Sequence, residues 1–238
     1  MKKFTTAIVA TTIALGIVSC KKELIGEGPM VTSHRTVSTF TALDLQMNGN
    51  VYYSEAPDPA IEITAKESIH GILETVVIDN RLVIRYTNGK IYDADPSIRI
   101  NVKGPGVQKF STANTGIINA MTDVHGTNIY LFSGGAGDIH MKGITATNLH
   151  AETKVSGSLN ATSGTVATVR LKTSASGTIN VSGVASRTAT AHTSGSGDIR
   201  VKVSDHLDAT ITGSGSIYFT GYPTLSSHLS GTGDLIRL

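Results

Sequence analysis

A glycine followed two residues later by an aliphatic residue recurs through the second half of the chain, at intervals of 18 to 21 residues. The glycines of this series are Gly116, Gly137, Gly157, Gly177, Gly197, Gly215 and Gly233. Alignment of the chain on them places the aliphatic residues in one column, Ile118, Ile139, Leu159, Ile179, Ile199, Ile217 and Leu235. A sustained period of about 20 residues is typical of repeat architectures, in which each unit packs on its neighbours.

The repeats have the pattern of β-strands. Apolar residues within each repeat are two positions apart, as in the pairs Leu149/Ala151 and Val169/Leu171, and this is the strand period. Glycine, serine and threonine at this density oppose helix formation. Each repeat therefore predicts strand, turn, strand, turn. Stacked columns favour an all-β fold, a right-handed β-helix (β-solenoid) with rungs of about 20 residues. A propeller blade would need about 40 residues.

The first half is a less regular β region. We expect a single β-helix domain over 31–238, with N-terminal rungs or a cap at 31–110 and the regular repeats at 111–238. Asp79-Asn80 between two apolar runs predicts a hairpin, and 67–74 predicts a short helix.

The first residues form a targeting segment. Lys2 and Lys3 precede an apolar stretch too short to span a membrane, so residues 1–19 are interpreted as a signal peptide. Ser19 directly precedes Cys20, the only cysteine, which resembles a bacterial lipobox and implies lipid on the Cys20 thiol. With lipid on Cys20, residues 20–30 would tether the body to a membrane. A plain signal peptide with a chance cysteine is the alternative. Lys21 favours the outer membrane because it is not the Asp that resembles an inner-membrane retention signal, and the side that the body faces stays open.

Charge excludes one class of partner. The chain has 20 Lys+Arg and 18 Asp+Glu, so removal of a leader with Lys2 and Lys3 leaves 18 of each sign. A sequence-independent nucleic-acid binder needs a basic surplus, so no nucleic-acid partner is expected.

Repeated strings such as Gly-Ser-Gly-Asp-Ile at 195–199 resemble those of a lipoprotein family of Gram-negative bacteria, the auto-transporter adhesin family with a head GIN domain. The segments 40–45, 48–51 and 80–84 add to the resemblance, which covers roughly 38–220. It implies a right-handed β-helix in the cell envelope and no established activity, and no site residue carries over from it.

Outward strand positions form ladders with about 4.8 Å between rungs. The ladder of His140, Asn160, Asn180, Arg200 and Tyr218 is the candidate binding surface, with a solvated sheet face as the alternative. A second ladder contains Asp138, Asp198 and Asp234, which we interpret as turn residues or possible ligand contacts. Asp138 and Asp198 are three rungs apart, about 14 Å, beyond the roughly 5–9.5 Å of paired glycosidase carboxylates. Asp198 and Asp234 are two rungs apart, about 10 Å, which only approaches that limit, and the final rung is the one most prone to fray. We therefore expect no catalytic residue.

No metal or cofactor is expected, because the eight histidines show no zinc-binding spacing, although calcium at the aspartate column stays open. The function expected is a non-catalytic, adhesin-like envelope module with a glycan or protein ligand. A polysaccharide-acting β-helix enzyme and a periplasmic structural or partner-binding protein are the alternatives. The last strand, at 235–238, predicts an open edge through which two copies would associate.

Overall fold

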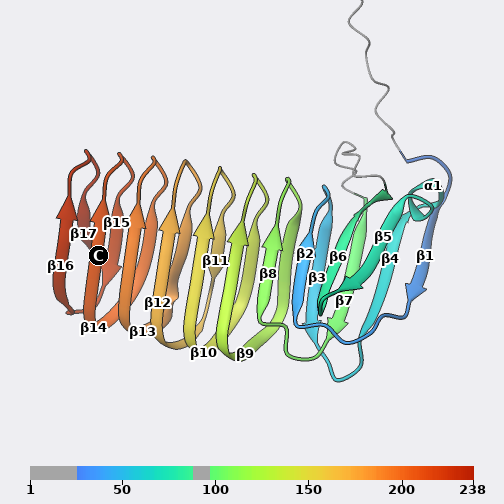
Figure 1. Ribbon diagram of the computed structural model, residues 1–238, viewed down its shortest axis with the longest axis horizontal. Helices are drawn as coiled ribbons and strands as arrows, with labels where there is room; N and C mark the ends of the chain where they lie inside the picture. The colour runs from blue at the N-terminus through green and yellow to red at the C-terminus, as the bar shows by residue number, and fades with distance from the viewer. Residues whose placement is uncertain (1–25, 88–96) are drawn as a thin grey trace, which may run out of the picture.

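Seventeen β-strands and one short helix make up the described part of the chain, residues 26–87 and 97–238 of a computed structural model. Figure 1 shows the strands stacked along one long axis. The N-terminal elements are β1 (Met30–Arg35), β2 (Ala42–Leu45), β3 (Asn50–Glu55), β4 (Ala60–Lys66), α1 (Glu67–His70), β5 (Leu73–Ile78), β6 (Arg81–Tyr86) and β7 (Arg99–Gly104). The remaining strands are β8 (Lys109–Thr112), β9 (Ile117–Ser133), β10 (Ile139–Thr153), β11 (Leu159–Ala161), β12 (Gly164–Thr173), β13 (Ile179–Thr193), β14 (Ile199–Ile211), β15 (Ile217–Thr220), β16 (Thr224–Leu229) and β17 (Leu235–Arg237).

From β8 onward, parallel pairing joins each turn of the chain to the next. Ile139 pairs with Ile118 of the preceding rung and with Leu159 of the following rung. Residues 109–237 form a β-solenoid of about six turns, which confirms the predicted fold class. One local detail differs from the prediction. β9, β10 and β13 continue through the second bend as strands of 17, 15 and 15 residues, where the sequence predicts a turn.

The inward positions of successive rungs form one apolar core. The column aligned on the repeat glycines is fully buried at Ile118, Ile139, Leu159, Ile179, Ile199 and Ile217. Near the N-terminal end the rings of Phe110 and Tyr53 meet edge to face, with centroids 5.3 Å apart and an interplanar angle of 70°. Burial of each such side chain contributes roughly 1.5–3 kcal/mol, so stacked rungs gain stability that a single rung lacks.

One interior column consists of hydroxyl residues instead of aliphatic ones. Its members, all buried, are Thr112, Ser133, Thr153, Thr173 and Thr193. Each stands four positions before a repeat glycine, and the hydroxyl groups of Ser133 and Thr193 donate to the carbonyl oxygens of Gly137 and Gly197, at 2.7 and 2.8 Å. A Cβ at Gly157 would collide with Ser133 Oγ of the preceding rung. At Gly137, Gly197, Gly215 and Gly233 the atom nearest an added Cβ is the carbonyl oxygen of the preceding repeat glycine. The close approach of successive backbones, with the hydroxyl column beside it in the middle rungs, therefore explains why glycine recurs at this point.

The N-terminal rungs do not follow the order of the chain. β2 pairs in parallel with both β6 and β8, and β3 pairs with both β7 and β9. β2 and β3 thus lie between β6 and β7 on one side and β8 and β9 on the other. The chain leaves this rung, forms the outer strands and returns. β1 and β4 pair antiparallel at that end, which Figure 1 shows opposite β16.

The expected hairpin and helix are both present in this region. β5 and β6 pair antiparallel, and Asp79 and Asn80 join them with φ values of 50° and 59°. Positive φ at both central residues is the geometry of a tight hairpin turn, which Asp and Asn tolerate. The helix α1 begins at Glu67 and ends at His70, four residues earlier than predicted, and the chain enters β5 at Leu73.

The last rung is more exposed than the others. Every residue of β16 is exposed, including Leu225 and Leu229. On β17, Arg237 pairs with Phe219 and so occupies an inward column that is apolar in earlier rungs. Its guanidinium carbon lies 5.4 Å from the Phe219 ring centroid and 5.0 Å from that of Tyr222. A cation therefore covers the β17 half of this end, whereas the β16 half presents leucines.

Candidate ligand-binding groove

The predicted binding surface is a continuous ladder, called here the Asn160 ladder. It contains His140, Asn160, Asn180, Arg200 and Tyr218, each paired in register with the next. The polar groups of the ladder largely contact one another or their neighbours. Asn160 Nδ2 lies 3.3 Å from His140 Nδ1, Asn180 Oδ1 accepts from Ser182 Oγ at 2.7 Å, and the Arg200 guanidinium lies 4.5 Å from the Tyr218 ring centroid. These contacts favour a structural role for the Asn160 ladder.

The three predicted aspartates lie where the chain enters the strands of this face. Oδ1 of Asp138 accepts from the backbone N–H of Ser158 at 2.7 Å, and Oδ1 of Asp198 accepts from that of Ser216 at 2.9 Å. The backbone N–H of Asp234 donates to Ser216 Oγ at 3.1 Å. Two of the carboxylates therefore tie one turn to the next. Within residues 26–87 and 97–238, no group of three or more His, Cys, Asp or Glu side chains could hold a metal ion.

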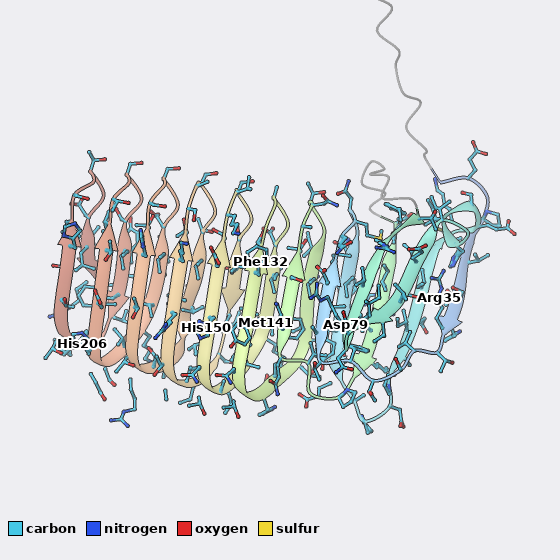
Figure 2. The ribbon with its side chains drawn as sticks, in the orientation of Figure 1. Arg35, Asp79, Phe132, Met141, His150 and His206 are labelled. Carbon is cyan, nitrogen blue, oxygen red and sulfur yellow. The ribbon has the colours of Figure 1, made fainter. Side chains whose placement is uncertain are left out.

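A groove of about 740 Å³ lies on a different strand face, and we call it the Tyr130 groove. Two neighbouring ladders line it. The first contains Lys109, Tyr130, His150, Arg170 and Thr190. The second contains Asp44, Ser111, Phe132, Glu152, Lys172 and His192. Figure 2 labels Phe132 and His150, which lie midway along the solenoid.

Aromatic rings form the centre of the Tyr130 groove. The rings of Tyr130 and His150 are stacked, with centroids 5.0 Å apart and an interplanar angle of 15°. Tyr130 is nevertheless 41% exposed. Phe132, in the second ladder, is on the same strand as Tyr130, and Lys154 Nζ lies 5.2 Å from the Phe132 ring centroid. The groove thus presents apolar ring surface between hydrogen-bonding and charged groups.

The charges that line the groove are unevenly paired. Lys172 Nζ lies 3.5 Å from Glu152 Oε1, and Arg81 Nη1 lies 3.8 Å from Asp44 Oδ2. Lys109 and Arg170 are exposed, and neither forms an ion pair with a described residue. Both carboxylates of the groove therefore have a cationic partner, while two cations are left without one.

The imidazoles of the groove are suited to hydrogen bonding. Burial, and then the positive charge of Arg170, lower the pKa of His150 below its ordinary value. The neutral ring keeps one N–H donor and one acceptor nitrogen near neutral pH. Nε2 of His192 is buried and lacks a hydrogen-bond partner within the described part of the chain. The His150 ring can therefore contribute polar contacts to a ligand.

The carboxylates of the groove do not form a hydrolytic pair. Asp44 and Glu152 belong to one ladder, three rungs apart, which corresponds to about 14 Å. Glycosidases that use paired carboxylates hold them roughly 5–9.5 Å apart. The arrangement of rings, cations and hydroxyl groups is suited to holding a ligand.

Sequence reasoning missed the Tyr130 groove, although its signal was present. The apolar pairs 129/131, 149/151 and 169/171 fix the register, and the residue between the members of each pair must point outward. That position is Tyr130, His150 and Arg170 in successive rungs. If the repeats had been aligned on the second apolar pair as well as on the glycines, Tyr130 and His150 would have been predicted to lie side by side.

The predicted leader, Cys20 and residues 20–25 of the tether lie outside the described residues. In residues 26–87 and 97–238, no helix has the length and hydropathy needed to cross a membrane. The membrane attachment at Cys20 therefore stays a prediction from the sequence.

The fold is a β-solenoid with a groove on one strand face. Residues 39–223 match the family described as "Putative auto-transporter adhesin, head GIN domain", and the chain belongs to this family. This confirms the resemblance that the repeated strings indicate. No curated protein sequence matches the chain significantly.

Solved structures share the fold. A crystal structure of a "putative adhesin" from Bacteroides fragilis has a TM-score of 0.83 and 22% identity, over 89% of this chain and 98% of that one. A "putative adhesin" from Parabacteroides merdae has a TM-score of 0.74 and 19% identity, over 90% and 98% of the two chains. A "putative lipid binding protein" from Parabacteroides distasonis has a TM-score of 0.74 and 21% identity, with the same coverage.

Proposed function

We propose that this protein is a non-catalytic, adhesin-like binding module of the cell envelope, attached to the outer membrane through lipid on Cys20. The observation that carries this proposal is the Tyr130 groove, which combines exposed ring surface with unpaired cations and keeps its carboxylates about 14 Å apart. The adhesin description of the family and of two structural neighbours supports it. An adhesin must face the outside of the cell, and this requirement can be tested.

Surface exposure gives the decisive measurement. Intact cells treated with a protease should lose the protein, detected with an antibody against 38–238, while a soluble periplasmic protein in the same cells stays uncut. A matched strain that carries Cys20→Ser should lose the protein from the membrane fraction, because lipid chains supply the anchor. Cleavage only after lysis would contradict the adhesin-like role and favour a periplasmic partner-binding protein.

We also propose that a second copy of this chain covers β16. In an antiparallel pair of two β16 strands centred on Ser227, Leu225 of each copy would lie opposite Leu229 of the other. Open strand edges pair with other chains in this way. The register of β16 on β14 already turns both leucines toward the inward columns, opposite Leu207 and Ile211. The leucines of the two copies would therefore lie on the same side of the paired strands and could pack on one another.

Introduction of positive charges at the β16 edge tests the dimer. The double substitution Leu225→Lys and Leu229→Lys should convert a dimer into a monomer in analytical ultracentrifugation, because four like charges would meet across the pair. The same change at exposed outward positions of this strand, Thr224→Lys with Ser226→Lys, serves as the control and should leave the dimer largely intact. A wild-type protein that sediments as a monomer would overturn the proposal.

A further inference from the structure

We propose that the Tyr130 groove binds an acidic glycan chain, with anionic groups of the glycan paired to Lys109 and Arg170 and sugar rings held between these cations. This inference rests on the proposed binding function and names its ligand class. It concerns a face of the solenoid separate from the Asn160 ladder. Charge, the arrangement of the ladder and the mixture of polar groups each support it.

The two unpaired cations define the length of the site. Lys109, Tyr130, His150 and Arg170 follow one another in register on four successive rungs. At about 4.8 Å for each rung, Lys109 and Arg170 are about 14 Å apart. An extended ligand that crosses the rungs would meet a cation at each end and two rings between them. The groove is therefore suited to an elongated chain that carries more than one negative charge.

The cations are of a type that binds carboxylate and sulfate groups. The planar guanidinium of Arg170 can donate two parallel hydrogen bonds to such an anion, and Lys109 adds a point charge. The carboxylates of Asp44 and Glu152 already lie against Arg81 and Lys172, so they do not neutralise Lys109 or Arg170. The net potential at the two ends of the ladder is thus positive and complementary to an anionic ligand.

The middle of the groove offers contacts to sugar hydroxyl groups and to the apolar edges of sugar rings. Tyr130 is 41% exposed, and Ser111 and Thr190 line the same groove. The carboxylate of Glu152, whose side chain is one third exposed, can still accept a hydrogen bond from a hydroxyl group, since a carboxylate has several lone pairs. Asp44 is buried and already accepts from Ser111 Oγ and Gln46 Nε2.

The carboxylates also distinguish a glycan from a nucleic acid. A polyphosphate backbone carries a charge at every nucleotide, and its affinity depends on neutralising many of them. Among the described residues of the groove, only Lys109 and Arg170 are free to pair with such a backbone, and its other phosphates would lie beside the partly exposed carboxylate of Glu152. An acidic glycan has hydroxyl groups between its charges, so it can place hydroxyl groups near the carboxylates and anions near Lys109 and Arg170.

Binding of defined polymers tests the inference. The full chain, kept in a non-ionic detergent, would be titrated calorimetrically with polygalacturonate, chondroitin sulfate, uncharged dextran and a single-stranded DNA oligonucleotide. We expect binding of at least one of the two acidic glycans, none to dextran, and weaker binding to DNA. Raising NaCl from about 50 to 500 mM should weaken glycan binding, because exposed ion pairs are screened. Polygalacturonate carries carboxylates alone, whereas chondroitin sulfate carries both carboxylates and sulfates. Binding to chondroitin sulfate alone would therefore indicate that sulfate groups are recognised.

A pair of double variants locates the site. Lys109→Gln with Arg170→Gln should lower the affinity at least tenfold. Lys142→Gln with Lys202→Gln removes the same charge from exposed positions outside the groove and should change the affinity less than twofold. Circular dichroism would confirm that both variants keep the strand content of the wild-type protein. If the groove variant fails to fold, Tyr130→Ser, which removes the exposed ring alone, replaces it in the same comparison.

Three results would overturn the inference. They are the absence of binding to both acidic glycans, tighter binding to the DNA oligonucleotide, and equal loss of affinity in the groove and control variants. None of these results would by itself refute the proposed envelope function, because protease treatment of intact cells tests that function independently. Conversely, a protein reached only after lysis would refute the adhesin-like role even if the groove bound a glycan.

Discussion

Replacement of Phe110 with alanine is expected to lower the free energy of unfolding by about 3–5 kcal/mol. Phe110 is fully buried, and its ring packs edge to face on Tyr53. It lies on β8, which joins the N-terminal rung of β2 to the regular solenoid at β9. A cavity at this point would weaken both interfaces. Urea denaturation followed by circular dichroism measures the effect.

Tyr222 provides the matched control for this substitution. Its ring is 87% exposed, and the Arg237 guanidinium carbon lies 5.0 Å from the ring centroid. Exposed cation–π contacts contribute about 0.5–1 kcal/mol, so Tyr222→Ala should cost at most that amount. Equal losses for the two variants would show that the Phe110 region is not the packed junction that the structure describes.

Replacement of Gly164 with alanine is expected to cost about 3 kcal/mol or more, because two penalties combine. The φ angle of Gly164 is +132°, a conformation that residues with a side chain rarely adopt. A Cβ there would also collide with the carbonyl oxygen of Ile144, one rung away. The backbone of two rungs would have to separate. The midpoint of urea unfolding should fall accordingly.

Gly71 is the control for the glycine substitution. Its φ is −74°, which alanine adopts without strain, and the nearest atom to an added Cβ is 3.9 Å away. Gly71→Ala should leave stability unchanged or raise it slightly, since alanine restricts the unfolded chain. A Gly164→Ala protein as stable as Gly71→Ala would contradict the close contact between β10 and β12.

Periodicity was enough to predict the regular half of the fold. Ile118 to Leu235 share one column because rungs stack in register, and the spacing of glycines and aliphatic residues records that register directly. The order of the N-terminal rungs could not be predicted in the same way. β2 lies between β6 and β8, and no repeat in the sequence marks a rung that the chain leaves and later encloses.

The candidate site was predicted less well than the fold. The glycine register drew attention to His140 and Asn160, which the structure places in one ladder whose polar groups are largely satisfied. Tyr130 and His150 lie on the other register, and their stacking depends on the alignment of two strands 20 residues apart. The groove beside them is formed by four or more rungs together. No single segment of the sequence therefore contains enough of the lining residues to predict the groove.

Because the rungs stack in register, the number of rungs also sets the length of the solenoid. Twenty residues separate Ile139, Leu159 and Ile179, so removal of one rung would bring the first and third into the same pairing. Length can therefore change only in whole steps of about 4.8 Å. Gain or loss of one 20-residue unit would move the last rung by this fixed distance relative to the N-terminal segment. Every remaining interface between rungs would be preserved. Because the Tyr130 groove is lined by residues up to His192, a unit gained or lost after that residue would change the length of the protein and leave the groove unchanged.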